Sequence, residues 1–131
     1  MANTMKLVTA AIIYKKDCVL LTRRKSGENL EGFWEFPGGK IEDKETPQEC
    51  LERELLEELG VRSNANEIIA ESIYKYDNGT IKLIGIETYL IDQKIELSVH
   101  DKFDWVSIKL LLDYKLSPAD IPIAKHIMEL I

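Results

Sequence analysis

The sequence has little of what builds disulfide frameworks, zinc sites or membrane spans. Its 131 residues include two cysteines, Cys18 and Cys50, and neither has the CxxC or ligand spacing of a metal site. We therefore interpret both as reduced packing residues of a cytoplasmic protein. No apolar run approaches the roughly 18 residues of a membrane-spanning helix, and the N-terminus lacks a signal-peptide pattern. Repeats, linkers and low-complexity segments are also absent, so we expect one soluble domain over residues 1–131 with no membrane partner.

Positive charge is scarce as well. The chain has 17 lysines and arginines against 23 aspartates and glutamates, which gives a net charge of -6. This balance argues against a basic surface for duplex nucleic acid, so we expect no nucleic-acid partner. Because 45% of the residues are hydrophobic, a chain of this length can bury a sizeable core.

One stretch, residues 39–61, carries the signals of a well-bounded helix. Thr46 and Pro47 suit the helix cap and the first turn, and Gly60 suits a left-handed C-cap. Between them, leucines recur at i, i+4 and i+8. This spacing predicts an apolar stripe that packs inward, formed by Leu51, Leu55 and Leu59.

The same helix carries Glu54, Glu57 and Glu58, whose spacing of i, i+3 and i+4 places them on one side. Glu54 and Glu58 fall beside the leucine stripe, whereas a purely solvated acidic face would lie opposite it. Carboxylates crowded at the edge of a core repel one another unless a cation neutralises them. Hard oxygen ligands suit Mg²⁺ or Mn²⁺ that bridges to substrate phosphates. The alternative is a charged surface helix with i, i+4 pairs.

The whole stretch matches the pattern G-x5-E-x7-R-E-U-x-E-E-x-G-U, where U is aliphatic, at every fixed position from Gly39 to Val61. It resembles the signature box of the Nudix hydrolases, which cut nucleoside diphosphates linked to a further group. The resemblance implies that Glu45 and Arg53 hold the preceding loop on the helix. It also implies a metal site and a catalytic set, which we assign to the Gly38 carbonyl, Arg53, Glu54, Glu57 and Glu58.

Within that set we choose Glu54 as the general base, because it lies next to Arg53. Many members of the family place one further carboxylate in a later loop, as an extra metal ligand or base. Asp101 is the nearest candidate for that position. Its neighbour His100 is more in keeping with a loop histidine than with a metal ligand.

The remaining segments predict a mixture of strands and helices. Strand-like patterns cover residues 6–14, 18–23, 68–76 and 81–91, with a short strand at 105–106. Asp77-Asn78-Gly79 is a strong hairpin signal. Residues 108–112 predict a short helical turn, and the last helix has a core stripe of Ile123, Ile127, Leu130 and Ile131. This order predicts an α/β fold with a mixed β-sheet sandwiched between helices (α/β/α), which is also the Nudix fold.

Two further stretches resemble the small mutator-type nucleotide hydrolases of this family, residues 34–40 and 116–122. The second is most similar to the CTP pyrophosphohydrolase branch, because 8-oxo-dGTP diphosphatases carry asparagine where Asp120 stands. An ionised aspartate only accepts hydrogen bonds, which fits the exocyclic amine of cytosine. A protonated Asp120 also donates, so 8-oxo-dGTP stays an alternative. Asp120 is equally a candidate helix N-cap, with Pro122 in the first turn.

Four other residues are candidates for substrate binding. Strand side chains alternate, so one residue of the Arg23-Arg24 pair faces the substrate, and we assign Arg24. Glu35 and Phe36 belong to the first mutator-like stretch, and Phe36 either stacks on a base or fills the core. Lys75 either meets a phosphate or is exposed to solvent.

These features predict a Mg²⁺-dependent nucleoside triphosphate pyrophosphohydrolase that makes (d)NMP and pyrophosphate and favours CTP, dCTP and 5-methyl-dCTP. The alternatives are an 8-oxo-dGTP diphosphatase and a non-catalytic nucleotide-sensing Nudix module. The proline that ADP-ribose pyrophosphatases carry beyond the box is absent, since the chain has no proline between Pro47 and Pro118. We expect a small nucleotide as partner and a monomer or homodimer as the assembly.

Overall fold

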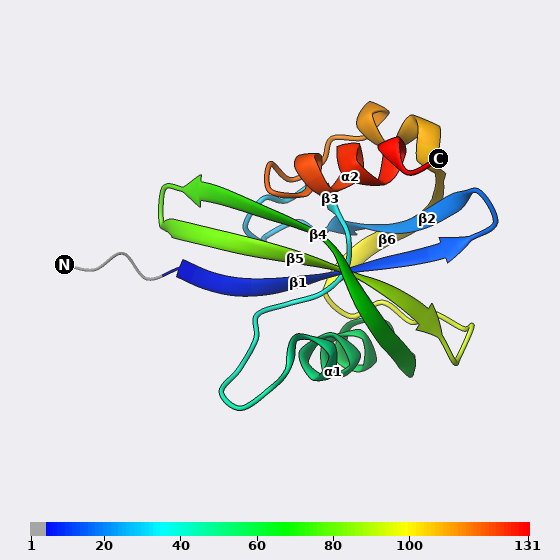
Figure 1. The fold of residues 1–131 in the computed structure, drawn as a ribbon, viewed down its shortest axis with the longest axis horizontal. Coiled ribbons are helices and arrows are strands. Elements are labelled where there is room, and N and C mark those ends of the chain that lie inside the picture. Colours follow the sequence, from blue (N-terminus) through cyan, green and yellow to red (C-terminus); the bar gives the residue numbers. More distant parts are fainter. Residues whose placement is uncertain (1–4) are drawn as a thin grey trace.

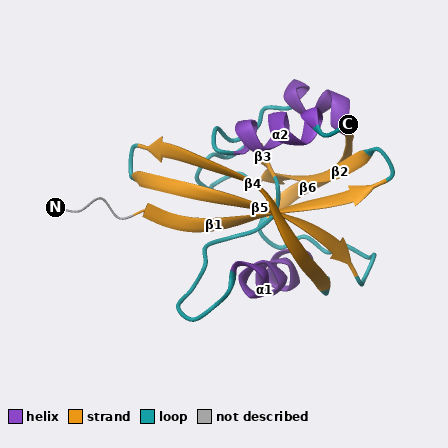
Figure 2. Ribbon diagram, in the orientation of Figure 1, coloured by secondary structure: helices purple, strands orange, loops and turns teal. Residues whose placement is uncertain are grey.

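The computed structural model describes residues 5–131 and contains strands, two α-helices and one 3-10 helix (Figure 2). In chain order the elements are β1 (Met5–Lys15), β2 (Cys18–Arg24), β3 (Trp34–Glu35), α1 (Pro47–Leu59), β4 (Ser63–Tyr76), β5 (Gly79–Leu90), β6 (His100–Ser107), η1 (Ile108–Asp113) and α2 (Asp120–Glu129). No helix in this part of the chain is long and apolar enough to cross a membrane.

A six-stranded mixed sheet lies between α1 on one side and α2 with η1 on the other (Figure 1). Residues 9–13 of β1 are buried on both faces, because their alternating side chains enter two separate cores. Ala10 and Ile12 pack in the core under α2, and Ala11 and Ile13 pack in the core over α1. The layered α/β/α arrangement is therefore the one predicted.

Near the centre of the sheet, β1 and β2 separate, and a loop occupies the space between them. Strand β1 pairs with β5 in parallel along most of its length, but with β2 only at the hairpin end, where Tyr14 faces Val19. Beyond that point β2 diverges, and the segment after β3 takes the free edge of β1. The N–H of Ala11 donates to the carbonyl of Pro37 at 2.7 Å, and the N–H of Thr9 donates to that of Gly39 at 2.8 Å. The sheet itself thus positions this loop.

Helix α1 begins and ends as its sequence predicts. The Thr46 hydroxyl accepts from the Glu49 N–H, and the Glu49 carboxylate accepts from the Thr46 N–H, which completes a capping box. Gly60 ends the helix in the left-handed conformation at φ 67°, where a glycine is favoured. The leucine stripe is fully buried.

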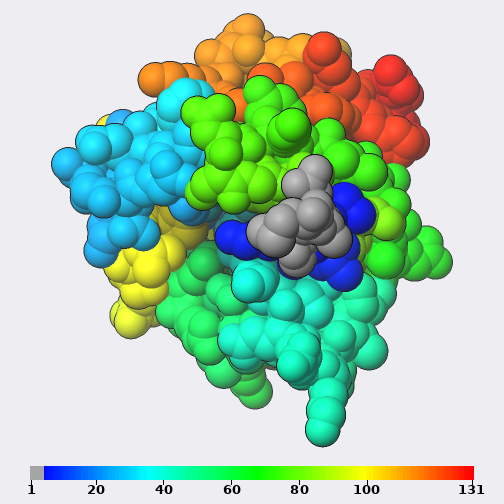
Figure 3. Space-filling model, turned by 90° about the vertical axis from the view of Figure 1, so that its left-hand side faces the viewer, coloured from blue at the N-terminus to red at the C-terminus, as the bar shows by residue number. Residues whose placement is uncertain are grey.

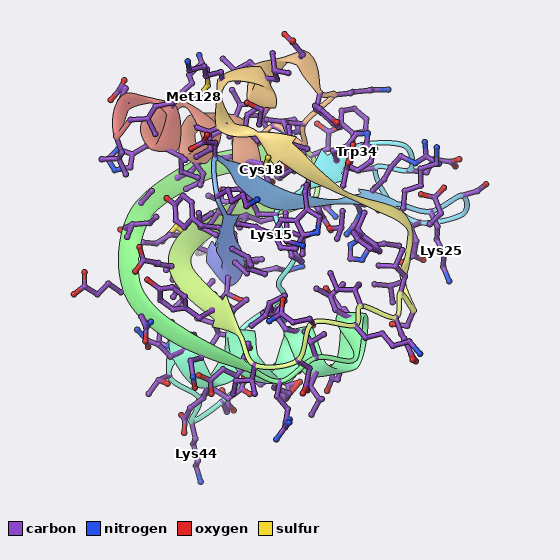
Figure 4. The ribbon with its side chains drawn as sticks, turned by 90° about the vertical axis from the view of Figure 1, so that its right-hand side faces the viewer. Lys15, Cys18, Lys25, Trp34, Lys44 and Met128 are labelled. Carbon is purple, nitrogen blue, oxygen red and sulfur yellow. The ribbon has the colours of Figure 1, made fainter. Side chains whose placement is uncertain are left out.

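Several boundaries differ from the sequence prediction. Strand β4 begins at Ser63 within a polar stretch, because the ladder to β5 starts with the pair Ser63 and Leu90. Strand β6 begins at His100 and is much longer than the two residues expected. The predicted core stripe of α2 is wrong at its end: Leu130 and Ile131 are 59% and 67% exposed, because the helix stops at Glu129. Strands β4 and β5 curve around one side of the molecule (Figure 4).

Candidate active site

Two glycines bring the loop after β3 against both the sheet and α1. A side chain at Gly38 would collide with the backbone of Thr9, and one at Gly39 would collide with the carboxylate of Glu54. The Thr9 hydroxyl also donates to the Gly39 carbonyl at 3.0 Å. Without side chains at these two positions, the loop backbone lies directly over the acidic edge of the helix.

Arg53 links this loop region to the helix. Its Nε and Nη2 donate to the two carboxylate oxygens of Glu45 at 2.6 and 3.0 Å, and its Nη1 donates to Glu54 Oε1 at 3.0 Å. The Arg53 guanidinium lowers the pKa of Glu45 to about 2. A weaker contact from Nη2 reaches the carbonyl of Lys40 at 3.4 Å. One side chain thus fixes the loop, as the family resemblance implies, and also orients Glu54.

Glu54 and Glu58 face the core edge together. The Glu54 side chain is 16% exposed, and Glu58 Oε1 is buried with no hydrogen-bond partner in the described residues. Burial, followed by the negative charges of Glu54 and Glu35, raises the pKa of the Glu58 carboxyl to about 9. An orphaned oxygen beside a second carboxylate is an arrangement that a bound cation would stabilise.

Glu57 does not join this pair. Its side chain is 59% exposed and contacts Arg53 Nη1 at 3.3 Å. Accordingly, residues 5–131 contain no ready-made cluster of three His, Cys, Asp or Glu side chains with metal-binding geometry. The expectation that three carboxylates crowd the core edge holds for Glu54 and Glu58 only. The donor set of carboxylates and a backbone carbonyl nevertheless fits Mg²⁺ or Mn²⁺, which keep several waters in such sites.

A cavity of about 280 Å³ lies on the other side of the loop, under the first turn of α2. Its apolar wall comes from β1 and β5 and includes Val8, Ile81 and Leu83. Arg24, Glu35 and Asp120 supply its charged side chains, together with Lys6 near the start of β1. The loop after β2, the β4–β5 hairpin and the segment before α2 gather at this end of the molecule, in blue, green and orange (Figure 3).

Asp120 stands in the wall of this cavity and is 5% exposed. Its Oδ2 accepts from the N–H of Phe36 at 2.9 Å. Asp120 is the first residue of α2 and makes no capping bond, so the N-cap interpretation is wrong. Burial raises the pKa of the Asp120 carboxyl well above its ordinary value, and the charge of Glu35 adds to that shift, while the Phe36 N–H and Arg24 oppose it.

Glu35 lies between the cavity and the acidic pair. Arg24 Nη1 donates to its carboxylate at 3.3 Å, and His100 Nε2 lies 3.0 Å from Glu35 Oε2. His100 is 5% exposed, so it is a buried partner of Glu35 and not a surface loop residue. The negative charge of Glu35 adds to burial in raising the pKa of both Glu58 and Asp120, so Glu35 acts on the acidic pair and on the cavity wall.

Three predicted residues lie away from the cavity. The Phe36 side chain is 3% exposed within the core, so the stacking interpretation is wrong and only its backbone N–H approaches the cavity wall. Lys75 is exposed on β4 and is not part of the lining. Asp101 forms a two-bond ion pair with Arg23 at 2.8 Å, which lowers the pKa of the aspartate and occupies its carboxylate. Its role as an extra metal ligand stays a prediction.

Sequence reasoning missed Tyr76 and Ser117 as cavity residues, and it did not foresee the pairing of His100 with Glu35. The Arg23 and Arg24 pair did divide as the strand alternation predicts, with Arg24 in the lining. No local pattern marks Tyr76 or Ser117, because each reaches the cavity through the packing of a distant element. The nearest signal was the run 116–122 itself.

Comparison with known proteins identifies relatives over most of the chain. The NUDIX domain model matches residues 5–127. The CTP pyrophosphohydrolase of Escherichia coli (strain K12) is 34% identical over 123 residues, which cover 94% of this chain and 91% of that protein. An 8-oxo-dGTP diphosphatase of Proteus vulgaris is 48% identical over 63 residues, covering 47% of this chain and 56% of the relative.

Solved structures agree with the architecture. The solution structure of the E. coli ORF135 protein has a TM-score of 0.85 at 34% identity and covers 98% of this chain and 91% of that one. The crystal structure of MutT protein from Methanosarcina mazei Go1 has a TM-score of 0.85 at 24% identity, with coverage of 98% and 96%, and is compared for its fold alone. The predicted mixed-sheet α/β fold is confirmed.

Proposed function

Since the chain belongs to the Nudix hydrolase family, we propose that it is a nucleoside triphosphate pyrophosphohydrolase dependent on Mg²⁺ or Mn²⁺. It converts (d)NTP and water to (d)NMP and pyrophosphate, and it favours CTP, dCTP and 5-methyl-dCTP. The observation that carries this proposal is the short loop from Phe36 to Gly39. Its first residue contacts Asp120 in the cavity wall, and its last lies against the Glu54 carboxylate. A nucleotide with its base in the cavity therefore extends its phosphates toward the acidic pair.

The metal would be held by the carboxylates of Glu54, Glu57 and Glu58 and by the Gly38 carbonyl. When bound, such an ion neutralises phosphate charge and lowers the pKa of the attacking water. Glu54 accepts the proton of that water, and Arg53 keeps Glu54 oriented through the 3.0 Å bond to Oε1. The water oxygen bonds to phosphorus while the anhydride bond between the α- and β-phosphoryl groups breaks. Pyrophosphate then leaves with the electron pair.

The base is read in the cavity. The volume of about 280 Å³ suits a nucleobase and not an entire nucleoside triphosphate, and its apolar wall of Val8, Ile81 and Leu83 suits a flat ring. Within residues 5–131, the Asp120 side chain makes one hydrogen bond, from the Phe36 N–H to Oδ2, which leaves Oδ1 for the substrate. An acceptor at that point pairs with the exocyclic amine of cytosine.

An 8-oxo-dGTP diphosphatase is the second candidate, and the raised pKa of Asp120 is the observation that favours it. A protonated carboxyl group offers both a donor and an acceptor, as the asparagine of the mutator-type enzymes does. The aspartate at this position therefore discriminates less sharply between the two substrates than its ionised form would.

A nucleotide panel with Mg²⁺ tests the proposal. Pyrophosphate release is measured for CTP, dCTP, 5-methyl-dCTP, 8-oxo-dGTP, dGTP and ATP, with Glu58→Gln as the inactive control. A preference for cytosine nucleotides supports the main proposal, and a preference for 8-oxo-dGTP moves the protein to the second candidate. An absence of turnover with every nucleotide would instead favour a sensing module. We also propose a cytoplasmic location and a single catalytic domain over residues 1–131.

A further inference from the structure

Tyr76, at the end of β4, presents a free donor to the cavity. Its Oη accepts from the N–H of Ala119 at 3.0 Å, and this is its only hydrogen bond within residues 5–131. The phenolic proton is therefore uncommitted, since an oxygen that accepts one bond still donates another. Tyr76 lines the cavity, and its ring packs on Tyr74 with the centroids 4.6 Å apart, so the side chain is held in place.

Ser117 is a second uncommitted hydroxyl in the same wall. Its side-chain Oγ is buried without a hydrogen-bond partner in the described residues, although the residue is only 3% exposed. Its backbone is fully engaged, because the N–H donates to the Trp34 carbonyl at 2.8 Å and the carbonyl accepts from Asp120 N–H at 2.9 Å. A buried hydroxyl that has lost water without gaining a partner costs free energy unless a ligand completes it.

We propose that Tyr76 and Ser117 form a second base-reading arm beside Asp120, which donates hydrogen bonds to an acceptor atom of the base. This inference rests on the proposed function and extends it from one reading residue to three. Tyr76 Oη accepts from the N–H of Ala119, directly before Asp120, and the Ser117 carbonyl accepts from the Asp120 N–H, so the three residues are neighbours in one part of the cavity wall.

Cytosine matches this arrangement of donors and acceptors. Its exocyclic amine donates, and the neighbouring ring nitrogen N3 and carbonyl O2 accept, along one continuous edge. Asp120 takes the amine, and the Tyr76 and Ser117 hydroxyls are left for N3 and O2. Uracil has a carbonyl in place of the amine and a donor at N3, so the same arm disfavours it.

The test compares variants against base analogues. Tyr76→Phe and Ser117→Ala each remove one hydroxyl and keep most of the packing. Tyr74→Phe and Ser72→Ala are matched controls. Tyr74 packs on Tyr76 at a tilt and lies outside the cavity lining, and Ser72 Oγ is a buried hydroxyl elsewhere on β4 with no partner in the described residues. The substrates are CTP, 3-deaza-CTP, which lacks the N3 acceptor, and 2-thio-CTP, whose O2 acceptor is weakened.

We expect each test variant to lower kcat/KM for CTP by roughly 10-fold, mainly through KM, while the controls stay within about twofold. At least one analogue should lose a similar factor with the wild-type protein and nothing further with Tyr76→Phe or Ser117→Ala. Equal losses for CTP and both analogues in the test variants would overturn the inference, because damage to the Ala119 contact affects all nucleotides alike. If the wild-type protein turns over no nucleotide, the proposed function fails as well, so the two failures are distinguishable.

Discussion

The two sides of the sheet are built in different ways. The acidic side comes from one continuous stretch, residues 39–61, in which a single arginine contacts Glu45, Glu54 and Glu57. The cavity side comes from β1, the loop after β2, the β4–β5 hairpin and the segment before α2. Within residues 5–131, the Asp120 and Tyr76 side chains each make a single hydrogen bond there, and the Tyr76 and Ser117 hydroxyls each have a donor to spare.

This difference separates chemistry from selectivity. On the acidic side, a change in one residue disturbs several others, because the contacts share the Arg53 guanidinium. On the cavity side, Tyr76 comes from β4, and Ser117 and Asp120 come from the start of α2 and the segment before it, so a side chain there can be replaced without removing a shared ion pair. Variants on the acidic side should therefore abolish turnover of every nucleotide, whereas variants in the cavity should alter the ranking of nucleotides.

The largest expected effect is that of Glu58→Gln. Losing a charged metal ligand should lower kcat by more than roughly 100-fold with every substrate, while the fold stays intact. Glu57→Gln should follow in the same direction with a smaller loss, because the Glu57 side chain is 59% exposed. Steady-state kinetics over a Mg²⁺ titration, with circular dichroism as the folding control, measures both. Full activity in both variants would contradict the assignment of Glu57 and Glu58 as metal ligands.

Arg53→Lys should act on stability and activity together. A lysine cannot reproduce the paired bonds to Glu45 while also contacting Glu54. We expect a loss of roughly 1.5–3 kcal/mol in the free energy of unfolding, together with lower kcat for all nucleotides. Urea unfolding gives the first quantity. An unchanged unfolding midpoint with normal kcat would show that the Arg53 contacts neither stabilise the fold nor orient Glu54 for catalysis.

Asp120→Ala should change preference and not metal dependence. Losing the base-reading carboxyl group should lower kcat/KM for the preferred nucleotide by roughly 10- to 100-fold, with less effect on poor substrates. Asp120→Asn is the informative partner, because an amide keeps a donor and an acceptor. If the Asp120→Asn variant retains the cytosine preference, an acceptor oxygen at this position is sufficient and the negative charge of Asp120 is not required. A uniform loss over the whole nucleotide panel would contradict base reading.

The protonation of Asp120 should contribute to the pH dependence of the free energy of unfolding. Its folded-state pKa is raised above the unfolded value, so between those two values the native state holds a proton that the unfolded state has lost. Stability should therefore fall as the pH rises above about 4, and Asp120→Asn should remove that part of the slope. Thermal unfolding of both proteins from pH 4 to 8 measures it. Parallel curves would mean that Asp120 is ionised in the folded protein.

The smallest effect is expected for Lys75→Ala. The side chain is exposed on β4 outside the cavity, so kcat/KM for CTP and the unfolding midpoint should both stay within error, with less than about 0.5 kcal/mol lost. Arg24→Ala serves as the contrast, because Arg24 lines the cavity and contacts Glu35. A large loss of kcat/KM in Lys75→Ala would indicate that Lys75 contacts a substrate phosphate and that the substrate extends along β4.

Sequence reasoning predicted the acidic side well because its signals are local. Caps, the leucine stripe and the Arg53 contact lie within one helix and its preceding loop, and a periodic pattern reports such features directly. The cavity depends on register and packing between distant segments. Whether Asp101 is free or paired is decided by the register shift in the β2–β6 ladder, which leaves Asp101 next to the Arg23–Lys102 pair and within reach of the Arg23 guanidinium. Tyr76 matters because α2 begins beside it. The exposure of the Glu57 and Leu130 side chains could not be predicted from the sequence either, since exposure depends on which other segments pack against a side chain.

The parallel pairing of β1 with β5 has a consequence for how the protein is made. Met5 pairs with Thr80 and Ile13 with Thr88, so β1 leaves the ribosome long before its main partner, β5, has been synthesised. Until then it has only its hairpin with β2, and its apolar side chains on both faces are exposed to other chains. Yield during synthesis should thus depend on how quickly the β4–β5 hairpin follows, and synonymous changes that slow translation between β2 and β5 should increase aggregation without altering the finished enzyme.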